Sequence, residues 1–170
     1  PGAAYCETNW YRPKCNCKMK ELGQPFCEVC KEQLVYKISE MVNYIEDYTP
    51  QNLTPIICRN TTQLFSINLL NNLNNTIRAQ WFVDNNLVLN NNLNFTFNPN
   101  LYTNGVHQIK VITYDTTAIA RKALIPHELT WNVNVSPLLS LTTSKTNVSC
   151  NSGNNGIATV IPTGGISPYT

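Results

Sequence analysis

Apolar and polar residues alternate along much of residues 51–137, and this period of two restricts the possible folds more than any other feature of the sequence. Such a period places apolar side chains on one face of a β-strand and polar side chains on the other. Short strands that recur at intervals of about ten residues predict an antiparallel β-sandwich, and hence a mainly β protein. The alternating sets are Phe65/Ile67/Leu69, Ile77/Ala79/Trp81/Val83, Phe95/Phe97, Ile109/Val111/Thr113 and Leu129/Trp131/Val133/Val135.

Turn-forming residues separate these predicted strands. Asn85-Asn86 predicts a turn, because Asn tolerates positive φ, and Asn104-Gly105 predicts a hairpin turn. Trp81 lies where immunoglobulin-like domains often bury a Trp, so we expect an immunoglobulin-like sandwich. The paired cysteines of antibody domains are absent from this segment, since Cys58 is its only cysteine.

The period is different in the residues that precede the β region. Residues 1–25 contain several Gly and Pro residues and are expected to be irregular. From Cys27 to Ile45 apolar residues recur every three or four positions, which predicts an amphipathic helix of about five turns. The expected apolar stripe comprises Cys27, Cys30, Leu34, Ile38, Met41 and Ile45, and the expected solvent face comprises Glu28, Lys31, Glu32, Lys37 and Glu40.

These changes of pattern predict three domains. The first covers residues 1–49, with a boundary near Thr49-Pro50, and the β-sandwich covers residues 50–137. Residues 138–170 form the third: Leu138 to Val148 indicates a linker or a first strand, and one or two short strands with Gly turns are expected after it.

Composition limits the classes of partner. Charged residues make up 13% of the chain and the net charge is +2. This balance gives no basic surface for nucleic acid, so no nucleic-acid partner is expected. No apolar run is long enough to span a membrane. The chain begins at Pro1, and we expect it to be a piece of a longer exported protein.

The cysteines gather near the N-terminus. Because exported proteins most often use such residues in disulfides, the candidate disulfide cysteines are Cys6, Cys15, Cys17, Cys27 and Cys30. The pattern C-x-C…C-x-x-C could instead supply four thiolates to structural Zn²⁺. A C-x-x-C at the start of a helix could also be redox-active, or some of the thiols could be free. The chain has 7 cysteines, an odd number, so at least one lacks an intrachain partner, and Cys58 and Cys150 are the expected leftovers.

Few other residues suggest chemistry. His107 is expected at a strand start and His127 in a loop after Pro126, each solvated or packed. Two isolated histidines form no Ser-His-Asp or Cys-His arrangement. Arg121-Lys122 is expected to be a solvated edge or turn, because two charges are too few for a phosphate-binding surface.

The N-terminal segment resembles a known peptidase family. The residues that carry the resemblance are Tyr11-Arg12-Pro13, Asn16-Cys-Lys-Met19 and Pro25-Phe26-Cys-Glu-Val-Cys30. Their order and spacing resemble the C-terminal end of the catalytic domain in the IgA-peptidase family of zinc metallopeptidases of Bacteroidetes. The resemblance implies that Met19 is the methionine of a metzincin-like Met-turn beneath the zinc-binding histidines. The alternative is a methionine packed in the core.

The other end of the chain resembles a different family. Residues 150–170 are similar to the start of an SprB-type repeat, found in surface and gliding adhesins of Bacteroidetes, and the phrase Gly164-Gly-Ile-Ser-Pro-Tyr169 carries the similarity. Together the two resemblances imply a secreted or cell-surface protein.

A peptidase of this kind binds zinc through His-Glu-x-x-His on a helix, with the Glu as general base. Glu128 follows His127, but Trp131 stands four positions after that histidine, so this chain cannot build such a site. We therefore expect no catalytic or metal residue here, with zinc and its ligands upstream in the parent protein. We expect the chain to be the C-terminal fragment of a secreted zinc endopeptidase and to be inactive alone. Its expected partner is the upstream catalytic domain of the same polypeptide, and the expected substrate of the whole enzyme is a protein or glycoprotein. The alternative is a non-enzymatic module of a cell-surface adhesin or gliding-type repeat protein.

Overall fold

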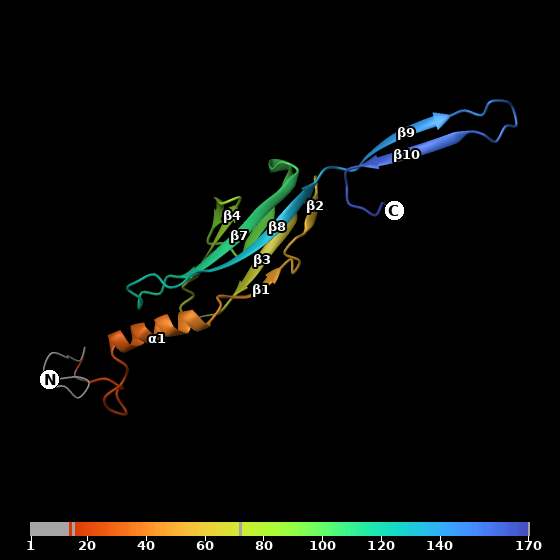
Figure 1. The fold of residues 1–170 in the computed structure, drawn as a ribbon. Helices are drawn as coiled ribbons and strands as arrows, with labels where there is room; N and C mark the ends of the chain where they lie inside the picture. Colours follow the sequence, from red (N-terminus) through yellow and green to blue (C-terminus); the bar gives the residue numbers. More distant parts are fainter. Residues whose placement is uncertain (1–13, 15, 72, 170) are drawn as a thin grey trace. The chain divides into compact units, whose positions relative to one another are not determined.

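The structure is a computed structural model that describes residues 14, 16–71 and 73–169. The described part is mainly β with one α-helix, as predicted (Figure 1). It divides into two compact units. The first, which we call the helical unit, comprises the residues up to Glu46 together with Leu69–Arg78 and Thr113–His127. The second, which we call the β unit, comprises Asp47–Asn68, Ala79–Ile112 and Glu128–Thr170. The first change of unit lies close to the predicted boundary, but two segments of the predicted sandwich join the helical unit.

The strands form three sheets. One has the order β1-β3-β6, with β1 at Ile45–Thr49, β3 at Gln63–Leu69 and β6 at Asn94–Phe97. The second has the order β2-β8-β7-β4-β5, with β2 at Ile56–Cys58, β4 at Ile77–Val83, β5 at Asn86–Asn90, β7 at Gly105–Asp115 and β8 at His127–Ser136. The third is the hairpin of β9, Ser140–Thr146, and β10, Ile157–Thr163.

The strand pair β2–β8 departs from the antiparallel prediction. The pairs β3–β6, β4–β5 and β9–β10 are antiparallel, whereas β2 runs parallel to β8 with Ile56 opposite Asn134. Backbone N–H groups of Asn132 and Asn134 donate to the carbonyls of Leu53 and Pro55 at 2.8 and 2.9 Å. These bonds hold the chain alongside β8 before and at the start of β2, and so set its direction.

Aromatic side chains fill the core of the β unit. Trp131 of β8 packs edge-on against Phe65 of β3 at a centroid distance of 5.2 Å and stacks with Trp81 of β4 at 5.8 Å. The contact with Phe65 joins the two larger sheets, which pack as a sandwich. Each indole N–H is satisfied, since Trp81 donates to the Asn92 carbonyl and Trp131 to the Pro50 carbonyl. The predicted alternation is confirmed most clearly in β4, where every second residue is buried.

Two predicted turns differ from the structure. Asp84 and Asn85 carry the positive φ angles, 49° and 65°, so this turn lies one residue before the predicted position and Asn86 already belongs to β5. Gly105 has φ 121° and begins β7, but the preceding strand β6 belongs to the other sheet. The predicted hairpin at Asn104-Gly105 is therefore wrong. The connection crosses between sheets through a short 3-10 helix, η1, at Pro99–Leu101.

The helix α1 spans Glu28–Met41, which is shorter than predicted, because Val42 is extended and Ile45 begins β1. Its buried face is also not the predicted one. Leu34, Ile38 and Met41 are 43%, 53% and 78% exposed, whereas Glu32 and Ser39 are buried. Contacts with the 113–127 segment of the same unit, described below, determine this orientation. Among the residues that the structure describes, no helix is long and apolar enough to cross a membrane.

Candidate functional site

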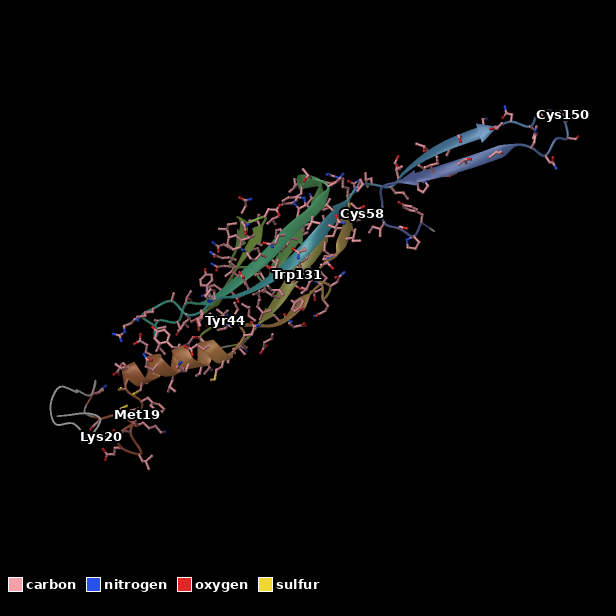
Figure 2. The ribbon with its side chains drawn as sticks, viewed as in Figure 1. Met19, Lys20, Tyr44, Cys58, Trp131 and Cys150 are labelled. Atoms are coloured by element: carbon pink, nitrogen blue, oxygen red, sulfur yellow. The ribbon has the colours of Figure 1, made fainter. Side chains whose placement is uncertain are left out.

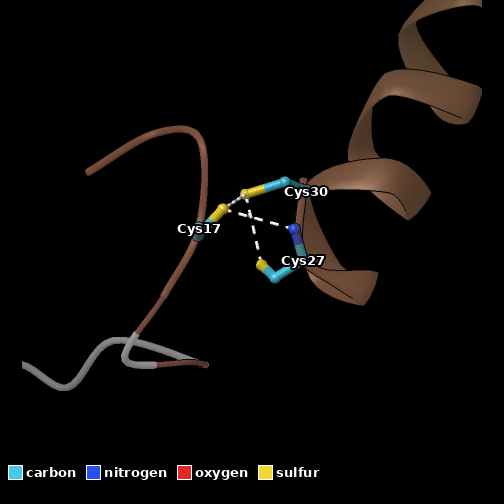
Figure 3. A group of neighbouring side chains, drawn as sticks. All are labelled: Cys17, Cys27 and Cys30. Atoms are coloured by element: carbon cyan, nitrogen blue, oxygen red, sulfur yellow. Dashed lines mark hydrogen bonds between the residues drawn. The ribbon is translucent and has the colours of Figure 1, made fainter. Parts of the chain in front are cut away.

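Three cysteines of the helical unit converge at the start of α1 (Figure 3). The Sγ atom of Cys30 lies 3.5 Å from that of Cys17 and 3.4 Å from that of Cys27. All three sulfur atoms lie within 4.8 Å of one another. Cys17 and Cys27 are buried and Cys30 is half-buried. We call these three residues the thiol cluster.

A tight loop and a helix end build the thiol cluster. The Lys18 N–H donates to the Pro25 carbonyl at 3.0 Å, and this bond closes the loop. Gly23, with φ 88°, supplies a left-handed conformation that other residues rarely adopt. Cys27 caps the helix and Cys30 follows three residues later, so both sulfur atoms lie on one side of its first turn.

Hydrogen bonding separates the acidities of two of these thiols. The Cys27 N–H donates to Cys17 Sγ at 3.3 Å, and this bond, with a further backbone bond from Met19, lowers the pKa of Cys17 to about 7. The neighbouring thiols of Cys27 and Cys17, together with burial, raise the pKa of Cys30 to about 12. The cluster therefore places a more acidic thiol, Cys17, beside a less acidic one, Cys30.

The described cysteines Cys17, Cys27, Cys30, Cys58 and Cys150 are all free thiols in the structure. Cys30 contacts both of its neighbours and can form a disulfide with only one of them. Cys6 and Cys15 lie outside the described residues. The disulfide expectation therefore stays a prediction, and the three converging sulfur atoms are equally a set of soft metal donors.

The family-motif residues are described in part. Tyr11, Arg12 and Pro13 lie outside the described residues. Asn16 is exposed, and Phe26 is half-buried with the Lys18 ammonium 5.7 Å from its ring centre. Met19 is 76% exposed in the described part of the chain, and its place in a Met-turn stays a prediction (Figure 2).

Both histidines pack against neighbouring residues. In the β unit, His107 Nδ1 lies 2.7 Å from Asp84 Oδ2, and Nε2 lies 2.9 Å from the Thr103 carbonyl. Burial would lower the pKa of His107, but these hydrogen bonds and the Asp84 charge outweigh it and raise the pKa. In the helical unit, His127 is the first residue of β8 and its ring packs 4.6 Å from that of Tyr44. Neither contact is a catalytic arrangement.

The ion pair between Arg121 and Glu32 was not predicted. Arg121 Nη2 lies 2.6 Å from Glu32 Oε2, and the Lys122 N–H donates to the Tyr36 hydroxyl at 2.8 Å. The prediction of a solvated turn at Arg121-Lys122 is confirmed, since the Arg121 side chain is 76% exposed, but this turn also binds α1. The partners stand 89 positions apart, so no local pattern could reveal the contact.

An apolar hollow lies beside α1 in the same unit. It has a volume of about 200 Å³ and its lining includes Val35, Ile38, Val42, Tyr44, Leu70 and Leu124. Ile38 belongs both to this hollow and to the exposed apolar stripe of the helix. The apolar surface of α1 thus continues into a depression.

No family model, no curated protein and no solved structure matches the chain. The thiol cluster and the exposed apolar side of α1 are therefore the structural features that bear on function.

Proposed function

We propose that this chain is the C-terminal part of a secreted zinc-dependent endopeptidase. In this proposal the helical unit completes the catalytic domain, the sandwich is an accessory immunoglobulin-like module, and the chain has no active site of its own. The observation that carries the proposal is that two of the three segments of the peptidase-like motif, residues 16–19 and 25–30, contact each other. The Cys27 N–H donates to Cys17 Sγ, and the Lys18 N–H donates to the Pro25 carbonyl. Both bonds join the loop that carries Met19 to the start of α1, and we take this as support for the proposal.

Exposed apolar side chains give a second support. Met19 and Leu22 in the loop before α1 are exposed, as are Leu34, Ile38 and Met41 on the helix. So many exposed apolar side chains on one small unit are typical of a surface that another domain covers. The upstream catalytic domain of the same polypeptide is the partner that we propose. Its helix would supply the zinc ligands, and Met19 would lie beneath them.

The proposal is tested by extending the protein upstream. The upstream coding sequence should encode His-Glu-x-x-His, and the extended protein should cleave a fluorescent protein substrate until a chelator removes its metal. The chain by itself should not cleave the substrate. An upstream sequence that lacks this motif, together with an inactive extended protein, would overturn the proposal.

A matched pair of variants tests the role of Met19. In the extended protein, Met19→Leu should lower kcat/KM, because the Met-turn thioether contacts the metal-binding residues. Met41→Leu is the control, since it changes the other methionine of the chain and keeps an apolar side chain at that position. Equal activity of both variants would remove Met19 from the proposed site.

A second candidate function is a module of a cell-surface adhesin. The observation that favours it is that the SprB-like residues 164–169, which follow β10, form a hydrogen-bonded turn. The Tyr169 hydroxyl donates to the Gly164 carbonyl at 2.7 Å, and the Gly165 N–H donates to the Pro137 carbonyl at 2.9 Å. An upstream sequence of further Asn/Thr-rich β modules, with binding of the purified chain to immobilised glycans, would support the adhesin over the peptidase.

A further inference from the structure

We propose that Cys17, Cys27 and Cys30 form a structural zinc site in which three thiolates bind one Zn²⁺ ion. The site lies within the helical unit and is separate from any catalytic zinc, whose ligands the proposed function places upstream. It does not depend on the peptidase assignment.

The spacing of the sulfur atoms carries this inference. A Zn–S bond is about 2.3 Å long, so two sulfur atoms on one tetrahedral zinc lie about 3.8 Å apart. The Sγ–Sγ distances of 3.5 and 3.4 Å at Cys30 differ from this value by only a few tenths of an ångström. A disulfide requires about 2.05 Å, so each of these pairs would have to close by well over an ångström. The cluster is therefore nearer to metal-site geometry than to disulfide geometry.

The number of thiols supports the same conclusion. Cys30 can form a disulfide with Cys17 or with Cys27, and either choice leaves the remaining buried thiol without a bonded partner among the described residues. One metal ion uses all three sulfur atoms together. Thiolates are soft ligands that select zinc, copper(I) or iron–sulfur clusters over magnesium or calcium. Zinc is the simplest of these, because it needs no redox partner and accepts a fourth ligand, such as water, to complete its tetrahedron.

Hydrogen-bond donors and positive charges near the thiol cluster would stabilise the negative charge of such a zinc site. Three thiolates and one Zn²⁺ carry a net negative charge. The Cys27 N–H already donates to Cys17 Sγ at 3.3 Å, and hydrogen bonds of this kind to a ligand atom orient and stabilise it. Lys18 and Lys20, in the loop that carries Cys17, supply positive charge. The ion would join this loop to the first turn of α1.

Metal content and cobalt substitution of the full chain test the site. Reduced chain incubated with Zn²⁺ and then freed of unbound metal should retain about one ion per molecule. Replacement by Co²⁺ should produce the sulfur-to-cobalt charge-transfer absorption and the intense visible bands of a tetrahedral thiolate site. Cys17→Ser, Cys27→Ser and Cys30→Ser should each weaken or abolish both signals. Cys58→Ser and Cys150→Ser are matched controls and should keep them.

Amide hydrogen exchange of α1 shows whether the helical unit of each variant remains folded, so loss of metal can be separated from unfolding. Three results would each overturn the proposal. These are no bound zinc in the reduced wild-type chain, equal loss of cobalt signal in the control variants, or peptide mapping of the isolated protein that finds Cys30 in a disulfide with Cys17 or Cys27. None of these measurements depends on peptidase activity, so a failure of this inference is distinct from a failure of the proposed function.

Discussion

The carboxylate of Glu32 in α1 accepts three hydrogen bonds from the guanidinium of Arg121 and one from its backbone N–H, at 2.6 to 3.1 Å. The Tyr36 hydroxyl adds another bond at 3.0 Å. Because these donors satisfy its carboxylate, Glu32 lies on the buried face of α1, while Leu34, Ile38 and Met41 of the predicted apolar stripe remain exposed. The Arg121 bonds, with a smaller contribution from Tyr36, lower the pKa of Glu32 to about 2.

Removal of the guanidinium should loosen α1. We expect Arg121→Ala to speed amide exchange in the helix and to lower the urea midpoint of the chain, because the buried carboxylate loses most of its donors. Lys122→Ala is the control, since its side chain is exposed and its backbone bond to Tyr36 persists. Because the folded pKa lies below the ordinary value of 4.5, this stabilisation is present above that value and is lost as the pH falls toward about 2. Unchanged helix exchange in Arg121→Ala would show that the ion pair does not hold the helix.

The exposed stripe should tolerate polar residues in this chain. Leu34→Gln with Met41→Gln should change the free energy of unfolding by no more than about 0.5 kcal/mol, as is usual for surface positions. Ser39→Arg, on the buried face of the same helix, should cost about 1–3 kcal/mol by overpacking. Urea unfolding followed by circular dichroism measures both. If the double variant proved the more destabilising of the two, the described orientation of α1 would be wrong.

The aromatic core of the β unit should depend on Phe65. Phe65→Ala should cost about 3–5 kcal/mol, because it leaves a cavity beside Trp131. Leu64→Ala is the matched control, since Leu64 lies on the same strand, points to the other face and is half exposed; its cost should be below about 1 kcal/mol. Similar unfolding midpoints for the two variants would contradict the sandwich core described above.

His107 and Asp84 should make the stability of the β unit depend on pH. Both ring nitrogens face acceptors, which favours the imidazolium. The pKa of His107 is raised, so its contribution is complete below about 6.5 and is lost as the pH rises through the folded value. For Asp84, burial opposes the shift, but the bonds from His107 and from the Gln108 N–H lower the pKa; its contribution is lost as the pH falls through that lowered value.

Both contributions are therefore complete between about pH 4 and 6.5. Asp84→Asn should flatten the fall in urea midpoint between neutral and mildly alkaline pH and should cost about 1 kcal/mol at pH 6, since the carboxylate is partly exposed. His127→Gln removes the other histidine and should keep the wild-type profile. A wild-type urea midpoint that rises between neutral and mildly alkaline pH would contradict the stabilising role given to the His107–Asp84 pair.

The hairpin of β9 and β10 should exchange its amide protons faster than β7 and β8. Nearly all of its side chains are exposed, and a two-stranded hairpin is marginally stable in water. Hydrogen exchange of the whole chain, read by mass spectrometry, compares these strands within one sample. Protection of β9 and β10 equal to that of β7 would show that another surface covers the hairpin.

Local sequence determined the strands and the residues that they bury. An alternating strand presents every second side chain to the same face, so β4 and β8 could be located, with their buried Trp81 and Trp131, from the order of residues alone. The spacing of Cys27 and Cys30 likewise indicated the start of a helix. These features follow from backbone geometry, which acts over a few neighbouring residues.

Tertiary structure decided which surfaces meet. The apolar spacing predicted that Leu34 and Ile38 would be buried, yet Arg121, 89 positions beyond Glu32, binds the opposite face of the helix. In the same way, Gly105 begins β7 after a crossing between sheets and not after a hairpin turn, because β6 and β7 pair with different strands. The convergence of Cys17 with Cys27 and Cys30 required the loop to close. Such contacts depend on which distant groups can satisfy one another after the chain has folded, and a periodic pattern carries no information about the partner.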